Sequence, residues 1–170
     1  LGYHVVGGIN SDFFTMGSGI PNGISIEEGV YKSSPEGNHA ISVVDGRLEL
    51  SASPQVELTL TNRRDDSSVS LTHFNKWRNS SGGLYLYNED FSTISTQTNA
   101  AGGRMVRFKV VDNGKSTDLT VNSTLTLEVV DVFETSDAVP IGEDNYILTA
   151  AYESGFYEVF ASYHVGDRVT

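Results

Sequence analysis

Short runs of β-branched and aromatic residues, separated by glycine-containing turns, recur along the whole sequence. Most of these runs alternate apolar with polar side chains, which is the two-residue period of a strand buried on one face. Helical periodicity is scarce, and its best candidates are short stretches near 12–16 and 143–151. The pattern therefore predicts a predominantly β domain. The predicted strands are 24–26, 40–44, 47–50, 56–60, 69–74, 84–87, 106–110, 125–130, 146–148 and 157–160.

The dipeptide Asp45-Gly46 gives the clearest hairpin signal. It separates the alternating segments 41–44 and 47–50, and both of its residues tolerate the positive φ angles that a type I′ turn needs. The long polar stretch 88–103 is predicted to be a loop, and its length suggests a functional one.

Length, charge and cysteine content exclude several classes of protein. A chain of 170 residues predicts a single domain. The absence of cysteine excludes a disulfide scaffold, a thiolate metal site and a cysteine nucleophile. A net charge of -11 argues against nonspecific binding to nucleic acid or to anionic membranes. No apolar run approaches the roughly 20 residues of a membrane span, so no membrane insertion is expected.

Both ends of the sequence are strand-like, whereas natural termini are usually polar and loosely ordered. We therefore expect residues 1–170 to be a single, incomplete domain that is cut at both ends and tethered to further domains of a longer chain.

The block 7–14 gathers chemistry-bearing side chains directly after the first strand-like segment. Its two glycines permit unusual backbone torsions and the close approach of a ligand. Asn10 and Asp12 place an amide and a carboxylate beside the rings of Phe13 and Phe14. Strand ends often carry sites, because a rigid sheet holds the loops there. The alternative is a tight turn with local Asx hydrogen bonds and two core phenylalanines.

Residues 16–23 form a second glycine-rich segment. It lacks the lysine of a Walker loop, and no helix pattern follows it to supply an N-terminal dipole. These features favour an ordinary surface turn.

Basic charge, an amide and the only tryptophan coincide at 75–78. Arg78 is suited to clamp a phosphate or a carboxylate, and Trp77 to stack on the face of a sugar. The alternative is a capping aromatic with a solvated arginine beside it. Other catalytic patterns are weak, because the histidines are dispersed, the acidic pairs do not follow calcium-loop spacing and no Gly-x-Ser-x-Gly elbow is present.

The order of these blocks resembles the phosphodiester glycosidase family. The specific part is 10–29, which is similar to the family's Asn-containing turn, Phe-Phe pair and Gly-x-Pro-x-Gly turn into a strand. Segments 40–46, 74–78, 84–87 and 166–169 resemble further family blocks in the same order. The family's C-terminal Asp-Gly-Gly-Gly-Ser-type segment has no counterpart in this sequence, so we expect this piece to hold part of a site and to be inactive alone.

The resemblance implies an α+β fold, predominantly β, built on a large, mostly antiparallel sheet with few short helices. It also implies a hydrolase of the secreted or cell-envelope compartment that cleaves a glycosyl phosphodiester. The partner would be a carbohydrate or glycosyl phosphodiester, with no nucleic acid. Two alternatives are a noncatalytic carbohydrate-binding or envelope-associated module, and a structural β domain that docks a neighbouring domain.

Carried over residue by residue, the resemblance implies catalytic roles for Asn10 and Asp12, with Arg78 as a weaker addition. Arg78, or a divalent cation held partly by Asp12, would stabilise the departing phosphate. Asp12 would alternatively act as an acid, base or nucleophile on the sugar side. The predicted substrate-binding residues are Phe13, Phe14, Gly19, Pro21, Gly23, Asn75 and Trp77.

Overall fold

The computed structural model describes residues 13–14, 16, 19–37, 39–78, 82–91, 102–111 and 117–170. In this part of the chain, strands dominate and one short helix, α1, is present. The main feature is a curled six-stranded sheet in which only one neighbouring pair of strands is parallel. The prediction of a predominantly β fold, with a mostly antiparallel sheet and few short helices, is confirmed.

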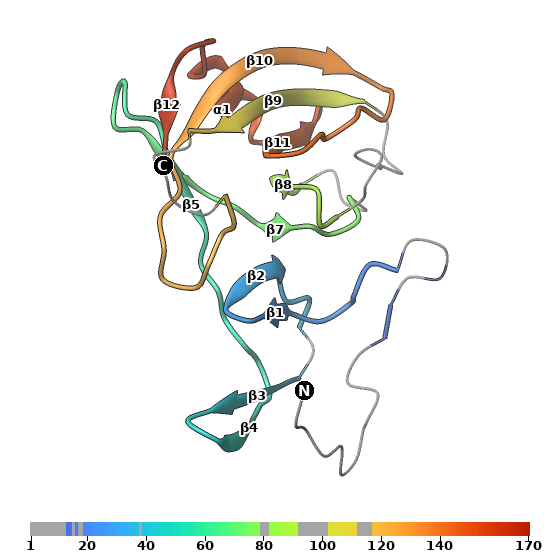
Figure 1. Ribbon diagram of the computed structural model, residues 1–170. Coiled ribbons are helices and arrows are strands. Elements are labelled where there is room, and N and C mark those ends of the chain that lie inside the picture. The colour runs from blue at the N-terminus through green and yellow to red at the C-terminus, as the bar shows by residue number, and fades with distance from the viewer. Residues whose placement is uncertain are drawn as a thin grey trace.

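The six-stranded sheet has the order β12-β10-β9-β11-β8-β7 (Figure 1). Strand β9 lies at its centre and pairs antiparallel with β10 and β11, so that Val106 faces Val132 on one side and Leu148 on the other. The edge strand β7 runs parallel to β8. The strands are β7 (His73–Phe74), β8 (Tyr85–Tyr87), β9 (Gly103–Val110), β10 (Leu127–Thr135), β11 (Asn145–Ala151) and β12 (Arg168–Val169).

The hairpin β5 (Thr59–Thr61) and β6 (Ser68–Ser70) continues the curl of this sheet. Thr61 and Thr170 exchange two backbone hydrogen bonds, of 2.7 and 3.0 Å, which attach β5 beyond the edge strand β12. The backbone N–H of Leu71 donates to the carbonyl of Leu58 at 2.8 Å. The residues just before β7 are therefore hydrogen-bonded to the residues just before β5. Because β5 also attaches beyond β12, the two edges of the sheet approach each other and the strands nearly close into a barrel.

The middle strands are buried on both faces. Leu86, Val106 and Leu148 belong to the larger apolar cluster, which fills the inside of the curl. Their sequence neighbours Tyr85 and Ile147 belong to a second, smaller cluster. Successive strand residues point to opposite faces, so two-sided burial requires nearly continuous apolar runs.

Two further hairpins precede β5. They are β1 (Ser25–Glu27) with β2 (Val30–Ser33), and β3 (Ala40–Val44) with β4 (Arg47–Ser51). In Figure 1, β1 and β2 lie beside the β7 edge of the sheet, and the β3–β4 hairpin lies farthest from it. The hairpin predicted around Asp45-Gly46 is confirmed, with φ angles of 50° and 75° at the two turn residues.

Two local predictions are wrong. Residues 157–160, predicted as a strand, lie in α1 (Tyr157–Ala161). The run is short enough to fit either period, and Phe160 packs on the larger cluster at helical spacing from Phe156. The helix candidate 143–151 is instead strand β11, which is buried on both faces between β8 and β9. The predicted strand 56–60 is a strand only from Thr59 onward.

The helix candidate near 12–16 and the first strand-like segment fall mainly outside the described residues. In the part of the chain that the structure describes, no helix has the length and apolar character needed to cross a membrane.

Candidate functional site

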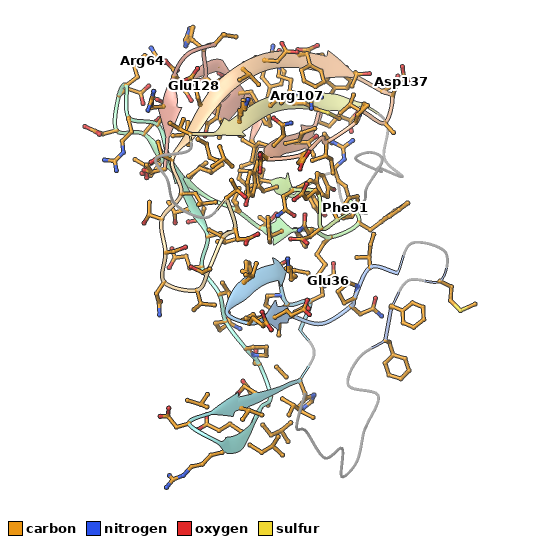
Figure 2. The ribbon with its side chains drawn as sticks, in the orientation of Figure 1. Glu36, Arg64, Phe91, Arg107, Glu128 and Asp137 are labelled. Atoms are coloured by element: carbon orange, nitrogen blue, oxygen red, sulfur yellow. The ribbon has the colours of Figure 1, made fainter. Side chains whose placement is uncertain are left out.

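A cleft of about 270 Å³ lies between the turn at 19–21 and the hairpin β1–β2. Charged and amide side chains from three separate parts of the chain meet in it. Phe91, which forms part of one wall, lies between the six-stranded sheet and the lower hairpins (Figure 2). The lining residues are Gly19, Ile20, Pro21, Ser25, Glu27, Lys32, Ser33, Asn75, Asp90 and Phe91.

A buried lysine fixes the turn that forms one wall of the cleft. Lys76 is only 1% exposed, and its Nζ donates to the carbonyls of Pro21 at 2.5 Å and Gly23 at 2.8 Å. The hydroxyl of Ser33 on β2 also donates to the Gly23 carbonyl, at 3.1 Å. An ammonium group is tolerated in such a place only when hydrogen bonds replace its water. Lys76 therefore couples the glycine-rich turn to the end of β7.

Asn75 forms the floor between β2 and β8. It follows β7 directly and has a φ of 50°, a left-handed conformation that asparagine adopts more readily than most residues. Its Nδ2 donates to the Lys32 carbonyl at 2.8 Å and to Oδ1 of Asn88 at 2.5 Å, while its Oδ1 accepts from the Asn88 N–H at 3.0 Å. Asn75 thus holds three segments of the chain together at the base of the cleft.

The ion pair between Lys32 and Asp90 lies at the cleft surface. Lys32 Nζ is 2.9 Å from Asp90 Oδ1, and each side chain is 27% exposed. Asn88 orients the carboxylate, because its Nδ2 donates to Asp90 Oδ2 at 3.2 Å. The hydrogen bond to Asp90 raises the pKa of Lys32, so Lys32 is a cation at neutral pH. A partly exposed pair of this kind can exchange its internal contact for a contact with a ligand.

Arg78 does not line the cleft; it is fully buried, close to Tyr85 and Tyr87. Its Nη1 donates to Thr149 Oγ1 at 3.2 Å and its Nη2 to the Gly102 carbonyl at 3.4 Å. Burial lowers the pKa of its guanidinium. The alternative of a solvated arginine is therefore wrong, and the catalytic role of Arg78 stays a prediction.

The structure brings together some of the predicted site residues. Gly19, Pro21 and Asn75 share the cleft, whereas Gly23 is outside its lining and accepts a hydrogen bond from Lys76. Trp77 is half-buried against the smaller cluster and lies outside the cleft lining. Asn10 and Asp12 lie outside the described residues.

The two phenylalanines before the turn are exposed. Phe13 and Phe14 are 79% and 58% exposed. Phe14 forms a β-bridge with Pro21, and the Asn22 N–H donates to the Phe13 carbonyl at 2.8 Å. They are not core residues, so that part of the alternative is wrong, while the turn it included lies outside the described residues.

No signal in the sequence marked Lys32. Glu27 and Asp90 belong to the acidic pairs Glu27-Glu28 and Glu89-Asp90, whose spacing fits no calcium loop, and Asp90 also lies in the polar stretch 88–103 that was predicted to be a loop. The pairing of β1 with β2 and the packing of β2 on β7 bring these side chains together. Lys76 is adjacent to residues that the pattern did single out, but nothing local indicates that its ammonium group is buried. Within the described ranges, no group of three or more histidine, aspartate or glutamate side chains could hold a metal ion.

No protein-family model and no curated protein matches this chain. A similar solved structure is the crystal structure of a hypothetical protein from Synechocystis, with a TM-score of 0.63 and 16% sequence identity. The match covers 95% of this chain and 27% of that chain. This likeness shows the fold alone. The chain spans about a quarter of the length of the solved protein that it matches.

Proposed function

We propose that the cleft binds a glycosyl phosphodiester and that the domain to which it belongs hydrolyses this ester in a secreted or cell-envelope glycan. One observation carries the proposal. The turn residues Gly19 and Pro21 and the distant Asn75, which the family resemblance marks as site residues, line one cleft with Lys32 and Asp90.

The polar groups of the cleft suit a sugar that carries a phosphate. The Lys32 ammonium supplies the positive charge that an anionic ligand needs in a protein with a net charge of -11. Carboxylate oxygens of Asp90 and Glu27, with the hydroxyl of Ser25, can hydrogen-bond to sugar hydroxyls. The backbone of Phe14 pairs with Pro21, a cleft residue, and its ring is exposed, so a sugar face can stack on it.

The proposed reaction is attack of water on the anomeric carbon. The new bond joins the water oxygen to that carbon, and the bond from the same carbon to the phosphate oxygen breaks. A carboxylate accepts the proton of the water, and the phosphate leaves as a monoester next to Lys32. Within the described lining, Asp90 and Glu27 are the carboxylates to which we assign this role. Asp12 is a further candidate from the resemblance.

The test is hydrolysis and binding of a panel of sugar 1-(methyl phosphodiesters), with and without divalent cations, by this chain and by the longer protein that contains it. We expect Lys32→Gln and Asp90→Asn to reduce turnover or affinity at least tenfold. The matched controls are Lys109→Gln, an exposed lysine on β9, and Asp137→Asn, an exposed aspartate after β10.

The proposal is wrong if no sugar phosphodiester binds or reacts, or if Lys32→Gln behaves like Lys109→Gln. Saturable binding without turnover in the longer protein would instead favour the noncatalytic carbohydrate-binding module.

A further inference from the structure

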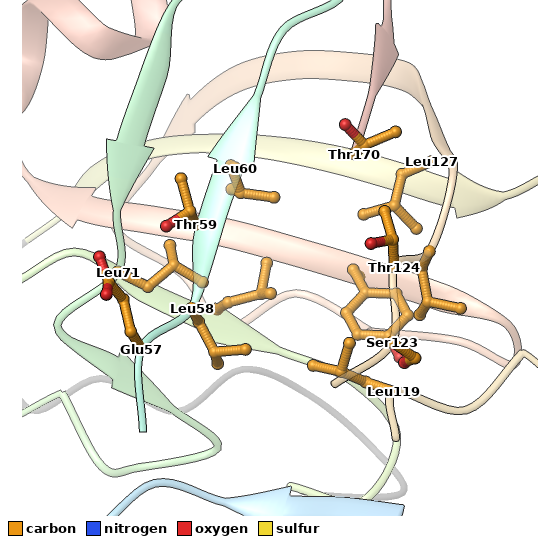
Figure 3. Close-up of a pocket in the computed structure, with 13 residues that line it drawn as sticks. Glu57, Leu58, Thr59, Leu60, Leu71, Leu119, Ser123, Thr124, Leu127 and Thr170 are labelled. Carbon is orange, nitrogen blue, oxygen red and sulfur yellow. The ribbon is translucent and has the colours of Figure 1, made fainter. Parts of the chain in front are cut away.

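The candidate cleft presents charges of both signs. A larger cavity, of about 360 Å³ between β5 and the segment that leads into β10, is lined mainly by leucine side chains (Figure 3), and Glu57 is the one charged residue in its described lining. The cleft instead combines the ammonium group of Lys32 with the carboxylates of Glu27 and Asp90. A ligand with more than one charged group therefore finds its partners in the cleft.

The two carboxylates of the cleft are held differently. Asp90 accepts hydrogen bonds from Lys32 at 2.9 Å and from Asn88 at 3.2 Å. Glu27 is exposed, and within the described residues its carboxylate takes part in no hydrogen bond or ion pair. Asp90 is thus already paired with a cation of the protein, whereas the charge of Glu27 is open to a ligand.

Negative charge surrounds Lys32. Its hydrogen bond to Asp90 is the main cause of its raised pKa, and the carboxylates of Asp118 and Glu27 raise this pKa further. One lysine and two carboxylates give the cleft lining a formal charge of -1, in a chain whose net charge is -11. A phosphodiester, which is an anion, is therefore attracted by Lys32 but repelled by the groups around it.

Glu27 and Lys32 are placed to hold two groups of one small molecule. They lie on the paired strands β1 and β2, and paired strands are about 4.8 Å apart. Because the two side chains form no ion pair with each other, the Glu27 carboxylate oxygens are more than 4.0 Å from Lys32 Nζ. A ligand with a phosphate on Lys32 and an ammonium group on Glu27 has no net charge, so the repulsion from the surrounding carboxylates is offset.

We propose that the cleft selects a glycosyl phosphodiester that also carries an ammonium group, and that Glu27 binds this group. The inference rests on the proposed function, because it assigns the phosphate of that same ligand to Lys32. With Glu27 engaged in this way, Asp90 is the carboxylate left to accept the proton of the attacking water. The ammonium group lies either on the sugar, as in an amino sugar, or on the alcohol that the phosphate esterifies.

The test compares two pairs of probes, with binding to this chain measured by calorimetry in the presence of EDTA. The first pair is glucosamine 1-(methyl phosphate) and N-acetylglucosamine 1-(methyl phosphate), which differ in charge on the sugar. The second pair is glucose 1-(2-aminoethyl phosphate) and glucose 1-(2-hydroxyethyl phosphate), which differ in charge on the alcohol. We expect the ammonium probe of at least one pair to bind about fivefold more tightly than its uncharged counterpart, and the pair that shows this preference identifies the position of the ammonium group.

Three variants assign the preference to a residue. Glu27→Gln should abolish it and leave the affinity for the uncharged probes nearly unchanged. Glu153→Gln, at another exposed glutamate, should keep the preference. Lys32→Gln should weaken the binding of all four probes, because each carries the phosphate. Backbone NMR signals of β1 and β2 establish that each variant is folded.

The outcomes separate this inference from the proposed function. The inference alone is overturned if the uncharged probes bind through Lys32 and the ammonium probes bind no more tightly, or if a folded Glu27→Gln variant keeps the preference. It is also overturned if magnesium, in place of EDTA, raises the affinity of the uncharged probes to that of the ammonium probes, because a metal ion would then occupy the place of the ammonium group. If none of the probes binds, the proposed function fails together with the inference.

Discussion

The Nζ atom of Lys76 lies 2.8 Å from the carbonyl oxygen of Gly23, a residue 53 positions earlier in the chain. This contact joins two segments that the family resemblance includes, the glycine-rich turn and the block at 75–78. It also orders one wall of the candidate cleft, because the same ammonium group binds the Pro21 carbonyl. Lys76 is buried and does not line the cleft, but it positions Pro21, which does.

Replacing Lys76 by Met should destabilise the protein and loosen the turn. The variant keeps most of the side-chain volume but removes two hydrogen bonds from an ammonium group, each worth about 1.5–3 kcal/mol in the general case. The desolvation of the lysine is relieved at the same time, so we expect a net loss of about 1–3 kcal/mol in urea unfolding. Lys109→Met, at an exposed position, should change stability by less than about 0.5 kcal/mol. Equal stabilities of the two variants would contradict this role of Lys76.

Gly103→Ala should be poorly tolerated. A Cβ atom at this position on β9 would lie 2.2 Å from the Ala150 carbonyl oxygen and 2.6 Å from Nη1 of the buried Arg78. Relief of this overlap requires a shift of the β9–β11 pairing, and we expect a cost of about 1–3 kcal/mol or more. Gly155→Ala is the matched control, because its Cβ would meet no atom within 4 Å. Thermal unfolding that is the same for both variants would show that β9 and β11 are not packed as described.

Leucines at two levels of burial should differ sharply in their effect on stability. Leu148 on β11 is fully buried, whereas Leu48 on the β3–β4 hairpin is 74% exposed. Leu148→Ala should cost about 2–5 kcal/mol through lost burial and the cavity that it leaves. Leu48→Ala should cost less than about 0.5 kcal/mol. Urea unfolding monitored by Trp77 fluorescence gives both values, and a large loss in Leu48→Ala would show that the hairpin face is covered in solution.

Stability should fall steeply at alkaline pH. Burial raises the pKa of Tyr146 and of Tyr163 to about 12, above the ordinary value of 10.0. In the unfolded chain these phenols ionise near 10, so the unfolded state releases its protons first. Their contribution to stability is therefore intact below pH 10 and is lost as the pH rises toward 12.

The measurement is urea unfolding between pH 8 and 12, with tyrosinate absorbance recorded in parallel. Tyr146→Phe and Tyr163→Phe should each reduce the alkaline loss of stability, whereas Tyr152→Phe, at an exposed tyrosine, should not. An unchanged pH profile in both buried-site variants would refute the assignment.

The hairpin at 40–51 could be predicted because its signals are local. Alternating side chains specify the faces of β3 and β4, and Asp45-Gly46 supplies the turn torsions without help from the rest of the fold. The strands β9 and β10 were predicted for the same reason, since each is long and strongly patterned. The helix at 157–160 could not be predicted, because a run of four residues fits the period of a strand as well as that of a helix. The packing of Phe160 on the larger cluster decides between them.

The residues of the candidate cleft also differ in how far the sequence indicates them. Gly19 and Pro21 were marked through the family resemblance, since the local pattern of 16–23 by itself favours an ordinary surface turn, and Asn75 was marked by its place beside Lys76, Trp77 and Arg78. Asp90 lies in the predicted loop 88–103 without an assigned role, and nothing in the sequence marked Lys32.

What the sequence determined by itself is therefore the strand-rich character of the chain, the local turns and the net charge of -11. These properties follow from neighbouring residues and from composition. Only the tertiary structure decided that β11 is buried on both faces, that Arg78 and Lys76 are inside, and that Lys32 meets Asp90 across 58 residues of chain. The physical reason is that burial and ion pairing depend on which distant strands become neighbours, and no local pattern specifies that choice.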